Sequence, residues 1–508
     1  MKSRTLTCIT AMTLLAALAL PVQLAAEANA AQANKPKHHH YKLIDLGTFG
    51  GPQAFTQDAP QFLTYRGVVV GWADTTTPDP NYPNSCFQFC VFGPFIFHAF
   101  RWNDGTLTDL GALPGVNSSA AFWVADNGLT AGFSENGEFD PLLNVPEIRA
   151  VLWNNKKLTD LGTLDGGYES GAFAVNTRGQ VTGFSTNLVP DSFSGLGPTQ
   201  QRTFLWQNGV MQDLGTLGGT DTGLLGIGFG NIEINERGQI VACSYTNTTP
   251  NPTTGLPTLD PFLWDEKNGM IDLGSLGGTV GCATGNGLNN AGQVIGYSTL
   301  PGDTVVHPFL WSRGVLRDLG TLGGDSGVPI SINDAGEVVG FTVDQSGEVL
   351  ATLWRNGAMI NLGTLNPLPN SNAQWINSKE QIVGFAATSD FKFPVAFLWE
   401  NGGPMVDLNT LVPPSKLHLA GALHINDRGE IAGNGTLPSG DAHNFLLIPC
   451  DDAHPNLRGC DYSFVDSSAA AASGLTRKRQ TSLNVDIRKV FQQLGHRYHL
   501  PILQAPTD

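Results

Sequence analysis

Basic residues are scarce in this sequence. Its 508 residues include 28 Lys and Arg against 44 Asp and Glu, which gives a formal net charge of −16 at pH 7. A protein that binds nucleic acid needs a basic surface to face the phosphate backbone. The acidic balance therefore argues against a nucleic-acid partner.

Apolar runs long enough to cross a membrane are lacking after the N-terminus. Residues 1–30 combine a basic start at Lys2 and Arg4, an apolar stretch over 6–20 and the small-residue pattern Ala-Asn-Ala at 28–30. These are the three parts of a secretory signal peptide. We therefore expect a secreted mature chain, extracellular or periplasmic, with no transmembrane segment.

Cysteine pairs of the Cys-x-x-Cys type are also missing, and no His stands at ligand spacing beside a Cys. Six cysteines follow the signal peptide, and an even number in an exported chain indicates disulfides. We favour pairing between chain neighbours, although other connectivities stay open. The expected pairs are Cys86–Cys90, Cys243–Cys282 and Cys450–Cys460.

No structured metal site is predicted. The nearest approach to one is the run of three histidines at 38–40, which falls in a segment, 31–41, that we expect to be flexible. Adventitious binding is the better interpretation of that run. Asp74 and Asp79 stand in an acidic loop, but the spacing of an EF-hand is absent. The sequence therefore predicts neither a metal nor a cofactor.

Glycine, by contrast, is plentiful, and much of it recurs in one phrase. Asp-Leu-Gly-Thr-Leu-Gly-Gly stands at 213–219 and 318–324, and variants begin at 45, 160 and 272. A phosphate-binding loop would be followed by a helix or would end in Lys-Ser/Thr, and neither is found here. We interpret the phrase as a repeated turn, in which Asp accepts backbone N–H groups and Gly adopts positive φ.

The phrase closes a unit of roughly 43 to 64 residues. Most units also contain a turn such as Asn-Asp-Ala-Gly, a Gly-x-Val-x-Gly-Phe-Ser run and a Phe-Leu-Trp run. The runs are short and rich in β-branched and aromatic residues, which favours strands. Four strands per unit at this spacing predict an all-β propeller. The Asp-Leu or Asn-Leu step that begins the phrase recurs eight times, at 45, 109, 160, 213, 272, 318, 361 and 407. Eight steps predict eight blades, and a seven-bladed ring with one degenerate unit is the alternative.

The propeller is expected to span 42–449 and to close on itself. The chain enters with a lone fourth strand at 42–46 and leaves with three strands that lack a fourth. The lone strand should complete the last sheet and so hide an open edge. A disulfide loop and linker (450–480) and an amphipathic helical tail (481–508) are expected to follow.

The combined pattern resembles the HAF family of bacterial extracellular repeats, which is named after a His-Ala-Phe phrase. Residues 98–100 carry that phrase verbatim, while 307–309 and 395–397 diverge from it. The resemblance covers about 42–449. It implies an extracellular location and a repeat fold, and it brings no catalytic residue with it.

Strand parity predicts which face of the ring binds a ligand. In an up-and-down sheet, the connections between second and third strands emerge on the same face as the repeated phrase. Insertions gathered on one face of a repeat protein often mark its binding face. These connections are long only in the first four units, at 74–96, 136–148, 186–201 and 246–260.

The first insertion supplies the candidate ligand-binding residues. It contains Tyr82, Phe87, Phe89 and Phe92, and the Cys86–Cys90 pair would stiffen it. Exposed aromatic rings suit carbohydrate or protein recognition. The alternative is that these rings cover the edge of a blade as a local core.

The sequence therefore favours a secreted recognition or scaffold module that binds an extracellular glycan or protein. A hydrolase would need paired carboxylates or a Ser-His-Asp set at one site, and no unit shows a distinctive combination. No catalytic residue is predicted. An extracellular polysaccharide-active hydrolase or lyase on the same scaffold is the alternative, and the sequence leaves the oligomeric state open.

Overall fold

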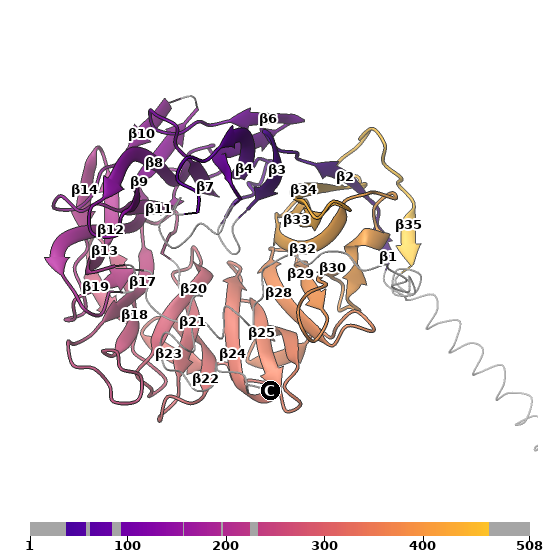
Figure 1. Ribbon diagram of the computed structural model, residues 1–508. Helices are drawn as coiled ribbons and strands as arrows, with labels where there is room; N and C mark the ends of the chain where they lie inside the picture. Colours follow the sequence, from indigo (N-terminus) through magenta and orange to yellow (C-terminus); the bar gives the residue numbers. More distant parts are fainter. Residues whose placement is uncertain are drawn as a thin grey trace, which may run out of the picture.

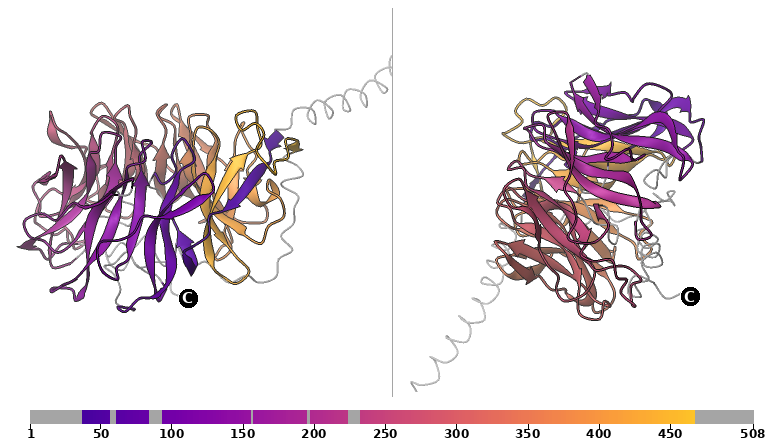
Figure 2. Two further views of the ribbon diagram at one scale, coloured as in Figure 1. Left: turned by 90° about the horizontal axis from the view of Figure 1, so that it is seen from above. Right: turned by 90° about the vertical axis from the view of Figure 1, so that its left-hand side faces the viewer.

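The protein is an all-β propeller. Its computed structural model describes residues 37–56, 61–83, 93–155, 157–194, 197–223 and 232–466. Mostly four-stranded antiparallel units stand around a central axis, and parallel contacts of β24 with β20 and β22 join two of them into one sheet. The first and last parts of the chain lie side by side (Figure 1). Seen edge-on, the strands run from one face of the ring to the other (Figure 2). None of the described residues forms a helix with the length and apolar character that a membrane crossing requires.

The sheets follow one another in chain order. The first half of the chain forms β3 (Gly50–Phe55), β4 (Val69–Pro78), β5 (Phe95–Asn103) and β6 (Thr106–Asp109); β7 (Ser119–Val124), β8 (Thr130–Asp140), β9 (Val145–Asn154) and β10 (Lys157–Asp160); β11 (Ser170–Val175), β12 (Val181–Pro190), β13 (Thr199–Gln207) and β14 (Val210–Asp213); and β15 (Thr222–Gly223), β16 (Glu233–Ile234), β17 (Ile240–Tyr245), β18 (Leu259–Asp265) and β19 (Gly269–Asp272).

The second half repeats the arrangement. It forms β20 (Gly281–Leu288), β21 (Val294–Thr299), β22 (Val306–Ser312) and β23 (Val315–Asp318); β24 (Gly323–Ile332), β25 (Val338–Asp344), β26 (Val349–Arg355) and β27 (Ala358–Asn361); β28 (Asn370–Ile376), β29 (Ile382–Ala387), β30 (Val395–Trp399) and β31 (Val406–Asp407), followed by the 3₁₀ turn η1 (Leu408–Thr410); and β32 (His418–Ile425), β33 (Ile431–Thr436) and β34 (Ala442–Pro449).

The core lies between neighbouring sheets. Second strands such as β17 and β21 are buried along their whole length, because both faces of each sheet pack against another sheet. Fourth strands such as β23 lie at the outer edge and are mostly exposed. The Phe of the recurring third-strand run is completely buried in most sheets, and these residues are Phe100, Phe204, Phe262, Phe309, Phe397 and Phe445.

The repeated glycine phrase is a turn, as predicted. Oδ1 of Asp213 accepts the N–H of Gly215 at 2.8 Å, and Oδ1 of Asp318 accepts the N–H of Gly320 at 2.7 Å. Gly215 has φ 81°, a conformation in which a side chain would be strained. The intervening Leu214 is buried. The phrase therefore ends one blade and begins the next.

The His of the His-Ala-Phe phrase pairs with the Asp of the turn phrase. His98 Nδ1 lies 2.8 Å from Asp109 Oδ2, and His307 Nδ1 lies 2.9 Å from Asp318 Oδ2. Burial raises the pKa of Asp109, but the hydrogen bonds from His98 and from a backbone N–H outweigh it, so the pKa is lowered overall. Two motifs that recur separately in the sequence thus meet on adjacent strands.

The predicted closure is confirmed. Strand β2 (Tyr41–Asp45) pairs antiparallel with β34, with Lys42 opposite Ile448 and Ile44 opposite Leu446. The fourth strand of the last sheet therefore comes from the start of the described chain. This arrangement leaves no open edge between the first and last sheets (Figure 1).

The prediction of a flexible segment over 31–41 is corrected for its last residues. Strand β1 (Lys37–His39) pairs with β35 (Phe464–Asp466), beyond the last sheet. His38 is buried, and its Nδ1 lies 2.8 Å from Glu400 Oε1. A carboxylate of the propeller thus holds the histidine run, which we had interpreted as free to bind metal adventitiously.

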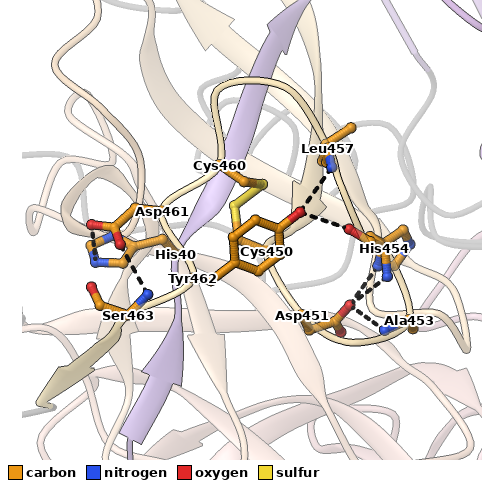
Figure 3. Close-up of a disulfide and its surroundings, with 10 residues drawn as sticks. All are labelled: His40, Cys450, Asp451, Ala453, His454, Leu457, Cys460, Asp461, Tyr462 and Ser463. Atoms are coloured by element: carbon orange, nitrogen blue, oxygen red, sulfur yellow. Dashed lines mark hydrogen bonds and ion pairs between the residues drawn. A yellow bond between two sulfur atoms is a disulfide. The ribbon is translucent and has the colours of Figure 1, made fainter.

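Two of the predicted disulfides are present, Cys243–Cys282 between neighbouring sheets and Cys450–Cys460 after β34. The second closes a loop beside β2, where His40 Nε2 lies 3.5 Å from Asp461 Oδ2 (Figure 3). The predicted Cys86–Cys90 pair lies outside the described residues, as do the signal peptide, the linker from residue 467 onward and the helical tail.

The predicted long insertions are in part extensions of the sheet. In the second unit, β8 continues to Asp140 and β9 resumes at Val145, so most of 136–148 is strand. We call these projecting hairpins the arms. The tips of the second, third and fourth arms begin at Asp140, Asp191 and Asn251, and each of these side chains accepts a backbone N–H two residues later.

Candidate functional site

The two faces of the ring differ. The turn face carries the short turns between first and second strands, such as 333–336, and the arm face carries the glycine phrases and the four arms. Successive strands of a blade run in opposite directions, so successive connections emerge on opposite faces. The connections between first and second strands therefore lie at one end of each blade, and the arms and glycine phrases lie at the other.

A hollow of about 340 Å³ opens on the turn face at the axis. The ends of first strands from many sheets line it, so residues hundreds of positions apart in sequence contribute to one wall. Its apolar lining includes Trp123, Val175, Ile234, Ile332, Trp375 and Ile425.

A belt of asparagine side chains surrounds the hollow and joins the blades. Each Nδ2 donates to the backbone oxygen of the equivalent residue in the next blade, at 2.9 to 3.2 Å. The last member, Asn426, donates to Thr64 O at 3.0 Å and so joins the last unit to the first. The belt members are Asn176, Asn235, Asn289, Asn333, Asn377 and Asn426.

Polar residues that follow the belt asparagines form the rim of the hollow, together with Asp126 at the equivalent position of the second unit. Their side chains accept a backbone N–H from the preceding blade, as when Asp427 Oδ1 accepts the Ser378 N–H at 2.8 Å and Asp334 Oδ1 accepts the Asn290 N–H at 2.8 Å. Some of these carboxylates use both oxygens in such contacts, as Asp334 does when its Oδ2 also accepts Asn290 Nδ2 at 3.3 Å. The acidic members of the rim are Asp126, Glu236, Asp334 and Asp427.

His424 is the most unusual side chain of the hollow. It is 4% exposed, stacks on Trp375 with ring centroids 3.7 Å apart and meets the edge of Phe62 at 5.6 Å. Neither ring nitrogen has a hydrogen-bond partner within the described part of the chain. Burial lowers the pKa of His424 to about 3, so the ring is neutral and offers one N–H donor and one nitrogen acceptor.

Tyr65 adds an exposed ring to the rim. Its side chain is 54% exposed although its backbone N–H is fixed by Asp126 Oδ1 at 3.0 Å. A ring that is held at its base and open at its face is available to stack on a ligand. The hollow therefore combines apolar floor, aromatic face, neutral imidazole and carboxylate rim.

Of the predicted ligand-binding residues, the structure describes Tyr82 alone. Tyr82 is exposed in the first arm and does not line the axial hollow. Phe87, Phe89 and Phe92 lie outside the described residues, so binding on the arm face stays a prediction.

A sequence signal could have found the hollow. The position two residues before each belt asparagine varies widely between units while its neighbours repeat: Ala174, Glu233, Ser331, Trp375 and His424 all occupy it. A register shift precedes it in several sheets, such as those between Ala373 and Trp375 and between Ala422 and His424. Variation inside a repeat marks residues that the fold does not require.

Groups of three or more His, Cys, Asp or Glu side chains able to hold a metal do not occur among the described residues. No model of a protein family matches the chain, and no curated protein matches it.

Solved structures of β-propellers do match. The β-propeller domain of the Trilobed protease from Pyrococcus furiosus is 10% identical, with 70% of this chain and 95% of that chain covered and a TM-score of 0.39. TolB from Acinetobacter baumannii is 12% identical, with 59% and 63% covered and a TM-score of 0.31. The lectin of Aleuria aurantia is 14% identical, with 57% and 92% covered and a TM-score of 0.28. At these values no function is transferred to this chain.

Proposed function

We propose that the protein is a secreted recognition module of the HAF repeat type, built as an eight-bladed propeller, that binds carbohydrate in its axial hollow. The eight Asp-Leu or Asn-Leu steps and the completion of the last sheet by β2 support the blade number. The signal-like N-terminus and the two disulfides support export.

The observation that carries the proposal is the unpartnered imidazole of His424 in the wall of the hollow. A buried polar group without a partner costs about 1–3 kcal/mol, so a ligand that supplies a donor and an acceptor gains that amount. Sugar hydroxyl groups supply both. The C–H face of a sugar ring also suits an aromatic side chain such as Tyr65, and its remaining hydroxyls suit the carboxylates of the rim.

Two alternatives lead to different outcomes. Ligands could instead bind the arm face through Tyr82, Phe87, Phe89 and Phe92. The module could also be an extracellular polysaccharide-active hydrolase or lyase, in which a carboxylate would act on the bound chain.

A glycan-binding screen with product analysis on the same glycans tests all three. We expect binding without turnover, and at least a tenfold loss of affinity in His424→Phe and in Tyr65→Ala. His424→Phe keeps the stacking on Trp375 and removes only the two nitrogens, so thermal unfolding should change little. Tyr82→Ser, on the opposite face, is the matched control and should bind as the wild type does.

Loss of binding in a Phe87, Phe89, Phe92 triple Ser variant, with His424→Phe unaffected, would move the site to the arm face. Turnover that a single rim substitution such as Asp427→Asn abolishes would instead establish the enzyme. No binding to any glycan by the wild-type chain would refute the carbohydrate proposal.

A further inference from the structure

We propose that the third arm and the following sheet bind a hard divalent cation, with the chemistry of Ca²⁺, between Asp191 and Asp221. The site is independent of the axial hollow and lies at the arm face. Asp191 begins the arm tip after β12, and Asp221 immediately precedes β15.

The two carboxyl groups are buried and face each other. Asp221 is 0% exposed and Asp191 is 8% exposed. One oxygen of each is used: Asp191 Oδ1 accepts the Phe193 N–H at 3.0 Å, and Asp221 Oδ1 accepts the Gln201 N–H at 2.9 Å. The second oxygen of each, Oδ2, has no hydrogen-bond partner among the described residues.

One amide oxygen and two hydroxyl oxygens of the same segments are also buried. They are Gln201 Oε1, Ser194 Oγ and Thr220 Oγ1. Gln201 is 0% exposed, and its Nε2 donates to Thr222 O at 3.0 Å, so the amide is held alongside Asp221 and its oxygen is left free. The Ser194 side chain faces the Asp221 carboxyl. The second oxygens of Asp191 and Asp221 and the amide oxygen of Gln201 thus lie at one buried interface, with the Ser194 hydroxyl beside Asp221.

Oxygen-only ligand sets are what Ca²⁺ prefers, since it takes 6–8 oxygens from carboxylates, amides, hydroxyls, backbone and water. The nearest cation does not serve the pair. Arg202 follows Gln201 on β13, but its guanidinium donates to Gln200 Oε1 at 2.8 Å and lies 3.8 Å from Asp213. Two adjacent buried carboxylates without a cation would repel each other strongly.

A shared proton is the competing occupant. Burial, together with Asp191, raises the pKa of Asp221 to about 8. A proton shared by the two carboxyl groups leaves the buried amide oxygen of Gln201 without a partner, whereas a cation can bind this oxygen and both carboxyl groups.

The next arm shows how the same position is satisfied without a cation. Asn251 stands where Asp191 stands, and its Oδ1 likewise accepts the N–H two residues later, at 2.7 Å. Its Nδ2 donates to Thr279 Oγ1 at 3.0 Å and to Asp303 Oδ2 at 3.3 Å. In the fourth arm, an amide N–H thus takes the place that the proposed cation has in the third arm, between the arm tip and a buried Asp. Asp191→Asn would introduce the same amide in the third arm.

Calorimetric titration of the chelator-treated full-length protein with CaCl₂ tests the proposal, together with thermal unfolding in Ca²⁺, in Mg²⁺ and in chelator. We expect one Ca²⁺ per chain and a clear rise in unfolding temperature with Ca²⁺. Asp191→Asn and Asp221→Asn should each reduce the affinity at least tenfold. Ser192→Ala, exposed in the same arm, should bind as the wild type does.

Absence of Ca²⁺ binding by the wild-type chain would overturn the proposal, as would Ca²⁺ binding that both substitutions leave intact. A proton would be assigned to the site by a different pattern. The wild-type unfolding temperature would then rise as the pH is lowered and would not respond to Ca²⁺, and Asp221→Asn would not show this pH dependence. Because Asp191→Asn mimics Asn251, it keeps the test decisive even where Asp221→Asn fails to fold.

Discussion

The two faces of the ring join their blades by different chemistry. On the turn face, neutral asparagine side chains donate to backbone oxygens, and the same bond recurs from blade to blade. On the arm face, the contacts between early blades use buried carboxyl groups, as when Glu169 accepts the Ile148 N–H and Asp221 accepts the Gln201 N–H. The asparagine bonds do not titrate, although buried Glu233 also joins two blades on the turn face. On the arm face, the raised pKa values of Glu169 and Asp221 make the contacts between blades depend on pH.

The largest expected effect lies at the turn-face end of a blade. Trp354 is buried between sheets, and Trp354→Ala should lower the free energy of unfolding by about 3–5 kcal/mol, through lost packing and a cavity. Trp311 occupies the same position in the preceding unit but is only partly buried, so Trp311→Ala should cost less. Urea unfolding followed by circular dichroism measures both. Equal losses would contradict the role assigned to burial.

The asparagine belt is the next test. Oδ1 of Asn377 accepts the N–H groups of Lys379 and Gln381, and its Nδ2 donates to Asn426 O. Asn377→Ala leaves these groups without partners and should cost about 2–3 kcal/mol of unfolding free energy. Ser378→Ala is the control, because the Ser378 backbone N–H that donates to Asp427 is kept. A belt substitution as mild as this control would show that the bonds do not stabilise the ring.

The arm face should show the stronger pH dependence. Burial, followed by the charges of Asp140 and Glu147, raises the pKa of Glu169 to about 9, despite a bond from the Ile148 N–H that lowers it. The folded state thus binds this proton more tightly than the unfolded state. Its contribution is complete below the unfolded pKa near 4.5 and is lost as the pH rises towards 9.

In Glu169→Gln, a neutral amide replaces the protonated carboxyl group. This variant should therefore lose the part of the pH dependence of stability that comes from Glu169. One carboxyl contributes up to about 1.4 kcal/mol per pH unit, so the stability of the variant relative to wild type should rise by about 2–3 kcal/mol between pH 6 and 8. Thermal unfolding in chelator across that range measures it, with exposed Glu138→Gln as the control. Parallel curves for wild type and Glu169→Gln would contradict the assignment.

The smallest effect is expected for the histidine pairs of the repeat. His307 faces an Asp318 side chain that is 42% exposed, so solvent screens the pair. His307→Gln should change the free energy of unfolding by less than about 1 kcal/mol at pH 6. A larger loss would mean that the motif stabilises the arm face by charge, and the contrast between the faces would need revision.

The sequence by itself determined the repeated turn, the four strands of each unit, the closing strand and two of the disulfides. The turn depends on Asp and Gly two residues apart, so local chemistry decides it. The closing strand follows from counting strands. The last unit lacks a fourth strand and the chain begins with an extra one, so pairing the two completes the last sheet. The resemblance to HAF repeats rests on the same local patterns.

The tertiary structure alone decided where the chemistry gathers. Ring closure brings Thr64 to Asn426, 362 positions apart, and a register shift next to Ala422 precedes His424, in the wall of the hollow beside Trp375. Each unit contributes one variable side chain to the axis. The pattern within a single repeat therefore does not specify which of these side chains meet there. Likewise, Asp191 and Asp221 look like ordinary loop acids in sequence, and only the packing of one blade on the next buries them together.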